Sequence, residues 1–194
     1  MARNTKTPWD IERTYIPGHY AVAGLTALAI VLKLRFFEIP YPAFPALKYD
    51  LSGVPLAVVA YFSLKSYIVS LLVFFIVNIT WADPIGMIMK VLAEASTGIP
   101  LAIIARKRRE QRVWELTGIL VSTLSRIALM TILNLLVTPY WLLMAKLAGN
   151  YGEAFTFTLM IMPHVVLFNA SLGVIVSTIA LAAIRVLRKA GYLK

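Results

Sequence analysis

The residues with chemistry suited to binding a small molecule fall into two groups, and the first lies in a short polar stretch near the start of the chain. Lys48, Asp50 and Ser52 alternate there, among prolines at positions 40, 42, 45 and 55. If the stretch is extended, these three side chains share one side and present a cation, an anion and a hydroxyl to the same space. The prolines stiffen it because each fixes φ. We interpret the stretch as a cap over a small-molecule site, and an ordinary loop whose prolines merely end a helix is the alternative.

The second group consists of polar side chains inside long apolar segments. Its members are Lys90, Glu94, Arg126, Asn134 and Asn169. Such groups are costly in hydrocarbon and usually face a cavity or one another. Lys90 and Glu94, four residues apart on one helical face, either neutralise each other or leave Lys90 as a substrate contact. Arg126 is predicted to pair with Glu94, and the two asparagines serve either a site or interhelical hydrogen bonds.

Several kinds of chemistry find no support in the sequence. It has no Gly-x-x-x-x-Gly-Lys-Ser/Thr phosphate-binding loop, so ATP hydrolysis by that route is not expected. It has no cysteine, and its two histidines, His19 and His164, are far apart, so we expect no metal site. No nucleophile with its base and no pair of carboxylates on one helical face is recognisable. We therefore expect that the protein is not an enzyme.

The elements that must position these residues are membrane helices. Of 194 residues, 60% are hydrophobic and 14% charged, and the mean hydropathy is +0.79. This composition belongs in a bilayer, and the length allows about six spanning helices without a separate soluble domain. We predict a single membrane-embedded domain over residues 1–194, an all-α bundle of six transmembrane helices. The expected spans are 19–37, 52–64, 67–79, 85–105, 113–137 and 157–186. Residues 142–155 are expected to form a loop with room for a short surface helix.

The charge distribution predicts the orientation of this bundle. The formal net charge is +10, and most of the basic residues flank the apolar segments in four places: segment 1–17, Lys65, the cluster 106–112 and the C-terminal end. With six spans these four places share one side, which the positive-inside rule makes cytoplasmic. Both termini are therefore predicted to be cytoplasmic, with 1–17 as a polar cytoplasmic segment, and the proline-rich stretch faces outward.

The first predicted span carries small residues at four-residue spacing, of which Ala23 and Ala27 form the clearest pair. Such a face lets two helix backbones approach closely. We expect a tightly packed neighbour there, either inside the bundle or on a partner protein.

Residues 47–55, Leu-Lys-Tyr-Asp-Leu-Ser-Gly-Val-Pro, resemble the first-loop signature of the substrate-binding S components of energy-coupling factor (ECF) vitamin transporters. The riboflavin-type group is the most similar, with a pattern of approximately Leu-Lys-Phe/Tyr-Asp-Phe-Ser-Asp-Ile-Pro. The small-residue face of the first span resembles the coupling motif of that family. Further matches follow in the family's order: Pro100 with the basic cluster 106–112, residues 130–134 with Pro139 and Tyr140, and Phe168-Asn169 with Gly173. Gly53 and Leu172 depart from the riboflavin-type pattern, which has an acidic residue and a lysine at these positions.

The resemblance implies a vitamin-binding subunit of a prokaryotic cell membrane, multi-pass and without a cofactor or an ATPase of its own. Its partners would be a transmembrane T component and two cytoplasmic ATPases, and it would take up a vitamin, riboflavin first among them. By carry-over, Leu47, Lys48, Asp50, Asn134 and Asn169 would bind the substrate, joined by Lys90 from the pattern above. Ala23 and Ala27 would contact the T component. No nucleic acid is expected.

Two other classes of function stay open from the sequence. A structural or assembly subunit of a membrane complex, with no ligand of its own, would account for the small-residue face and the basic clusters. It would leave the stiff polar stretch without a role. A membrane-embedded enzyme would need a catalytic cluster that the sequence does not show.

Overall fold

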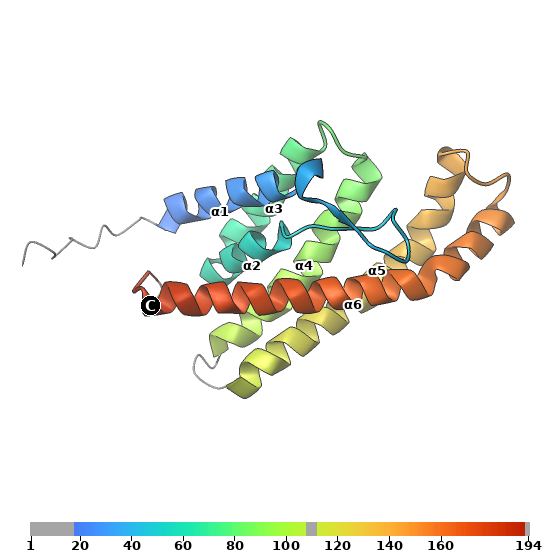
Figure 1. Ribbon diagram of the computed structural model, residues 1–194. Coiled ribbons are helices and arrows are strands. Elements are labelled where there is room, and N and C mark those ends of the chain that lie inside the picture. The colour runs from blue at the N-terminus through green and yellow to red at the C-terminus, as the bar shows by residue number, and fades with distance from the viewer. Residues whose placement is uncertain (1–17, 108–111, 193–194) are drawn as a thin grey trace, which may run out of the picture.

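The computed structural model describes residues 18–107 and 112–192, and six α-helices make up most of this part of the chain (Figure 1). Their bounds are α1 Gly18–Leu32, α2 Gly53–Phe62, α3 Leu64–Asn78, α4 Pro84–Lys107, α5 Arg112–Met144 and α6 Tyr151–Lys189. The polar segment 1–17 and the centre of the basic cluster, 108–111, lie outside the described residues. The prediction of an all-α fold with six helices is confirmed for the described part.

The helices differ in length. Three of them, α4, α5 and α6, are long and apolar enough to cross a membrane, whereas α1, α2 and α3 have between 10 and 15 residues. At 1.5 Å per residue, α2 is only about 15 Å long, roughly half the thickness of a bilayer core. It is nevertheless the most enclosed helix, with Leu56, Val59 and Ala60 packed in one core cluster and Ala57 and Val58 in another. The shortest helix, α2, therefore lies in the interior of the bundle.

The sequence-based boundaries of the last two helices are wrong. The sequence predicts that the fifth helix ends at 137, before Pro139, and that residues 142–155 form a loop with room for a short surface helix. Instead, α5 continues through Pro139 to Met144, and α6 begins at Tyr151 after the Asn150 side chain accepts a hydrogen bond of 2.9 Å from Glu153 N. In apolar surroundings the helix is the only source of partners for backbone groups, so a helix can absorb a proline that would end it in water.

The two longest helices, α5 and α6, pack closely against each other. The hydroxyls of Ser122 and Ser177 are hydrogen-bonded at 2.8 Å in the buried contact. A Cβ added at Gly173 would lie 3.2 Å from the Cα of Thr123, so a larger residue there would push the helices apart. Small residues and a buried hydroxyl pair are typical of helices packed in membranes.

The carboxyl-terminal ends of α2, α4 and α6 meet at one end of the bundle. Arg106 of α4 donates to the carbonyl of Tyr61 at 2.9 Å and to that of Ala60, two last-turn carbonyls of α2 that lack partners within their helix. Arg188 of α6 donates to the Tyr61 hydroxyl at 2.5 Å. Figure 1 shows the beginning of α1 and the end of α6 at this same end.

The connection between α1 and α2, residues 33–52, lies toward the other end and is called the α1–α2 loop below. It contains a 3-10 turn, Arg35–Phe37, and two short antiparallel strands, β1 (Ile39–Pro40) and β2 (Lys48–Tyr49). The stretch is not extended as far as Ser52, so the condition for a single-sided row of Lys48, Asp50 and Ser52 is not met. Ser52 has helical φ and ψ, and its N–H and hydroxyl donate to Asp50. Asp50 and Ser52 are buried, while Lys48 is exposed.

Candidate functional site

Aromatic side chains hold the α1–α2 loop against α6. The hydroxyl of Tyr49 is 2.7 Å from that of Ser171, and its ring lies 4.9 Å from the ring of Phe168. Tyr41, which follows β1 in the same loop, has its ring 5.9 Å from the ring of Phe168 and also contacts the ring of His164. Aromatic pairs at these separations contribute beyond the area they bury. The loop is thus fixed by side chains far from it in sequence.

A cavity of about 440 Å³ lies beneath this loop. Its wall includes all six residues that the sequence predicted for substrate binding: Leu47, Lys48 and Asp50 of the loop, Lys90 of α4, Asn134 of α5 and Asn169 of α6. Segments 122 residues apart in sequence therefore converge on one space, since Leu47 and Asn169 both belong to its wall. Contact of these six residues with a substrate stays a prediction.

Much of the remaining wall is apolar, and sequence reasoning missed most of it. Methionine and aromatic side chains are prominent, including Phe44, Met89, Met130, Trp141, Phe157 and Phe168. Helical spacing was the available signal, because residues four apart lie on one face. Met130 is four residues from both Arg126 and Asn134, and Val165 is four residues before Asn169. The one-turn neighbours of buried polar residues would have indicated this wall.

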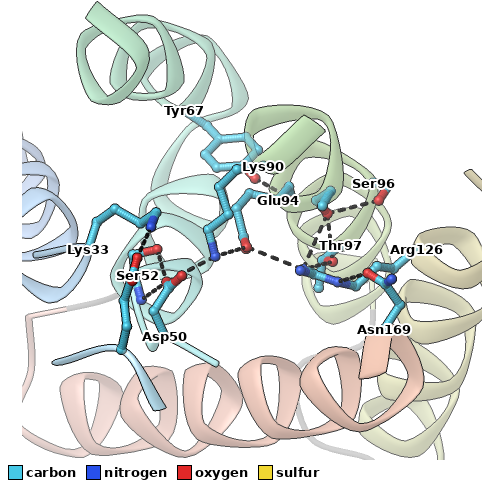
Figure 2. Close-up of polar contacts among 12 residues, drawn as sticks. Lys33, Asp50, Ser52, Tyr67, Lys90, Glu94, Ser96, Thr97, Arg126 and Asn169 are labelled. Atoms are coloured by element: carbon cyan, nitrogen blue, oxygen red, sulfur yellow. Dashed lines mark hydrogen bonds and ion pairs between the residues drawn. The ribbon is translucent and has the colours of Figure 1, made fainter. Parts of the chain in front are cut away.

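A chain of polar contacts connects four elements around the cavity: the α1–α2 loop, α4, α5 and α6 (Figure 2). We call Asp50, Lys90, Glu94, Arg126 and Asn169 the charge network. Lys90 Nζ lies 2.9 Å from Asp50 Oδ1 and 2.8 Å from Glu94 Oε1. Arg126 Nη1 lies 3.2 Å from the same Glu94 oxygen, and its Nε donates to Asn169 Oδ1 at 3.1 Å. The predicted Lys90–Glu94 and Arg126–Glu94 pairs are confirmed.

The network contains two cations and two anions, so it carries no net charge. This balance matters because its side chains are buried, and a lone buried charge is far more costly than a compensated pair. The other cations in the cavity wall are also paired: Lys33 with Glu38, and Lys48 with Glu38 at 2.8 Å. The described wall therefore offers a ligand no cation without an anionic partner.

The two acidic residues of the α1–α2 loop that take part in ion pairs are ionised at neutral pH. Burial alone would raise the pKa of Asp50, but the neighbouring Lys90 and the hydrogen bond from Ser52 outweigh it and hold this pKa below its usual value. Burial likewise opposes ionisation of Glu38, and its bonds to Lys33 and Lys48 lower its pKa. The ion pairs within the loop, and the pair that ties the loop to α4, are thus present at neutral pH.

The two asparagines of the wall have different surroundings. Asn169 is buried, donates to Val165 O at 2.8 Å and accepts from Arg126, so it belongs to the charge network. Asn134 is half-buried, and its bonds stay within its own helix, to Met130 O at 2.8 Å and from Thr138 at 3.0 Å. An amide nitrogen has two donor hydrogens, so Asn134 keeps hydrogen-bonding capacity toward the cavity.

Ala23 and Ala27 lie on the outer surface of α1 and do not belong to the cavity wall. Both are exposed, as are their neighbours Gly24 and Leu28. The opposite face of the helix, with Thr26 and Ala29, is buried, and Thr26 donates to Ser70 of α3 at 2.7 Å. The neighbour expected for the small-residue face is thus not within the described part of this chain.

No protein-family model matches the sequence, and a search of curated proteins finds no match. A comparison with solved structures finds a chain described as the S component of a bacterial ECF transporter. It matches 89% of this chain and 95% of its own length, with a TM-score of 0.69 and 26% sequence identity. The fold and the arrangement of the helices are therefore similar to those of that S component over nearly the whole chain.

Proposed function

We propose that this chain is the substrate-capture subunit of an ECF-type transporter, which binds a vitamin or a related small molecule under the α1–α2 loop. The observation that carries the proposal is the convergence of the loop, α4, α5 and α6 on a cavity of about 440 Å³. This size is within the range of small-molecule sites, and a mostly apolar wall with a few fixed polar groups is typical of them. The similarity to an S component supports the same role.

Riboflavin is the ligand that we propose. The buried carboxylates of Asp50 and Glu94 compensate the two cations deepest in the wall, Lys90 and Arg126. An anionic vitamin would have to draw one of these cations away from its buried partner, whereas an uncharged ligand would not. Riboflavin is uncharged at neutral pH and has a planar ring system. Phe44, Trp141 and Phe168 provide aromatic surface against which such a ring can pack, and Asn134 provides an amide for its polar edge.

In this proposal the cavity faces the outside of a prokaryotic cell, and the end formed by Arg106 and Arg188 faces the cytoplasm. The basic residues near that end support this orientation through the positive-inside rule. The chain itself would bind the vitamin. A T component would contact α1 through Ala23 and Ala27, and two cytoplasmic ATPases would supply the energy for uptake.

Riboflavin titration of the purified protein tests the function directly. We expect the protein in detergent to bind about one riboflavin per chain and to quench the flavin fluorescence, because the ring enters a low-polarity aromatic cavity. Flavin absorbance in the purified preparation would be the same result without titration. A preparation that is empty and binds neither riboflavin nor another vitamin would instead favour the structural or assembly subunit.

Replacing Asn134 by Leu tests the cavity wall. We expect riboflavin affinity to fall about tenfold, the loss of roughly one hydrogen bond of about 1.4 kcal/mol. Stability should change little, because both hydrogen bonds of this amide lie within α5. Isothermal titration calorimetry and thermal unfolding would measure the two quantities. Thr117→Val, which removes a hydroxyl of α5 outside the cavity wall, is the matched control, and unchanged affinity in Asn134→Leu would remove Asn134 from the site.

A further inference from the structure

Glu94 is the one carboxylate of the charge network that does not belong to the cavity wall. It is 1% exposed and lies behind Lys90 and Arg126, both of which do line the cavity. A single oxygen, Oε1, accepts from Lys90 Nζ at 2.8 Å and from Arg126 Nη1 at 3.2 Å. The positions of two cations at the cavity thus depend on one anion that a ligand does not touch.

The place of the Glu94 carboxylate depends on a glycine in another helix. A Cβ added at Gly53, the first residue of α2, would lie 2.8 Å from Glu94 Cδ and 3.2 Å from Oε1, and closer still to Oε2. The carboxylate therefore fills the space that any other residue at position 53 would occupy. The position also suits an anion, because the amino-terminal end of a helix carries partial positive charge. Ser52, which precedes α2, uses its hydroxyl on Asp50 and does not cap the helix.

A second glycine fixes the backbone of Glu94. The hydroxyl of Tyr67 in α3 donates to the Glu94 carbonyl at 2.6 Å. A Cβ at Gly98, one turn further along α4, would lie 2.5 Å from that hydroxyl and 2.7 Å from Cζ. The Glu94 carboxylate and the Tyr67 hydroxyl that bonds the Glu94 carbonyl therefore each lie in a space that only a glycine leaves open. A carboxylate that only neutralised the charge of Lys90 would not need its position to be fixed at both the side chain and the backbone.

From this arrangement we propose that Glu94, seated over Gly53, is a positioning residue that holds the α1–α2 loop closed over the cavity. Its carboxylate sets the Lys90 ammonium, and Lys90 in turn holds Asp50 of the loop at 2.9 Å. The same carboxylate orients Arg126 toward Asn169 of α6. The effect on loop closure follows from the geometry alone, and only the effect on riboflavin affinity rests on the proposed function.

Loop closure can be measured without any ligand, because the chain contains no cysteine. Val165 lines the cavity and is 1% exposed, so a Val165→Cys protein should react slowly with a water-soluble maleimide while the loop is closed. In this background we expect Glu94→Gln and Gly53→Ala each to raise the labelling rate about tenfold, as the loss of one charge-assisted contact would. Gly118→Ala is the matched glycine control, since its Cβ would meet Leu101 at an ordinary 3.4 Å.

Exchange of the carboxylate between the two helices separates positioning from a general loss of stability. Gly53→Asp combined with Glu94→Ala returns an anion to the same space from the other side, and we expect labelling to slow to within about threefold of the Val165→Cys rate. Gly53→Asp alone crowds two carboxylates together and should label fastest. The proposal is overturned if Glu94→Gln and Gly53→Ala both label at the control rate, or if the exchanged pair, shown to be folded by its thermal unfolding, labels as fast as Glu94→Gln.

Riboflavin affinity of the cysteine-free variants, measured by fluorescence titration, is the second readout. We expect the affinity to fall about tenfold in Glu94→Gln and to recover in the exchanged pair, in parallel with labelling. If no protein binds riboflavin but labelling follows the expected order, the proposed ligand fails while the role of Glu94 stands. If riboflavin binds equally to all variants while labelling does not change, Glu94 has no positioning role and the proposed function stands.

Discussion

Replacing Arg126 by Leu is expected to lower the free energy of unfolding by about 3 to 5 kcal/mol, the cost of leaving a buried charge without its partner. Arg126 is 2% exposed, and it donates through Nη1 to Glu94 and Thr97 and through Nε to Asn169. Its removal leaves the network with one cation and two anions. The same change leaves the oxygen of Asn169 without the donor that it has in the structure, which adds to the cost.

Thermal unfolding in detergent measures this effect, and a second variant identifies its cause. In Arg126→Leu with Glu94→Gln, the remaining Lys90 and Asp50 balance each other. We therefore expect the double variant to be more stable than Arg126→Leu alone, although it carries two changes. Arg185→Leu is the control, because the pair of Arg185 with Glu115 is exposed and should contribute less than about 1 kcal/mol. A double variant that unfolds below Arg126→Leu would show that charge balance does not stabilise this core.

The order and class of the helices could be predicted because apolar segments of this length admit few structures other than helices. Their ends could not, as the last two helices show. A proline followed by Tyr140 and Trp141 reads as a helix end in water, but α5 continues past it because packing and the lack of competing water keep the backbone helical. The tight turn near Gly149 was recognisable by composition, but only the Asn150 cap places the start of α6 at Tyr151.

Polar residues inside apolar segments were the informative signal for the site. Lys90, Glu94 and Arg126 needed partners in hydrocarbon, and simple charge balance indicated which partners they would take. The role of Gly53 could not be predicted in this way. The riboflavin-type sequence pattern has an acidic residue at position 53, where this chain has glycine. In the structure, the carboxylate of Glu94 from another helix lies in the space that the Cβ of such a residue would occupy. A contact between residues 41 positions apart becomes visible only when the fold brings α2 and α4 together.

Enlarging Ala23 and Ala27 together to Leu is expected to abolish vitamin uptake while leaving vitamin binding unchanged. Both residues are exposed on α1 and do not line the cavity, so larger side chains there enlarge the outer surface and leave the cavity wall unchanged. Exposed substitutions of this kind usually change stability by less than about 0.5 kcal/mol. A partner helix that packs closely against the two alanines would be displaced, because close approach of two helices in a membrane requires small residues on the facing surfaces.

Uptake of labelled riboflavin by cells that express this chain with a T component and its ATPases would measure the effect. We expect transport by the double variant to fall at least about tenfold, and riboflavin affinity of the purified protein to stay within about twofold. Val69→Phe provides a comparable increase in size on an exposed face of α3 and should transport normally. Normal transport by the α1 variant would place the partner contact elsewhere on the chain. An equal loss in both variants would mean that any added bulk on the outer surface of the bundle interferes, so that the pair Ala23 and Ala27 has no special part in coupling.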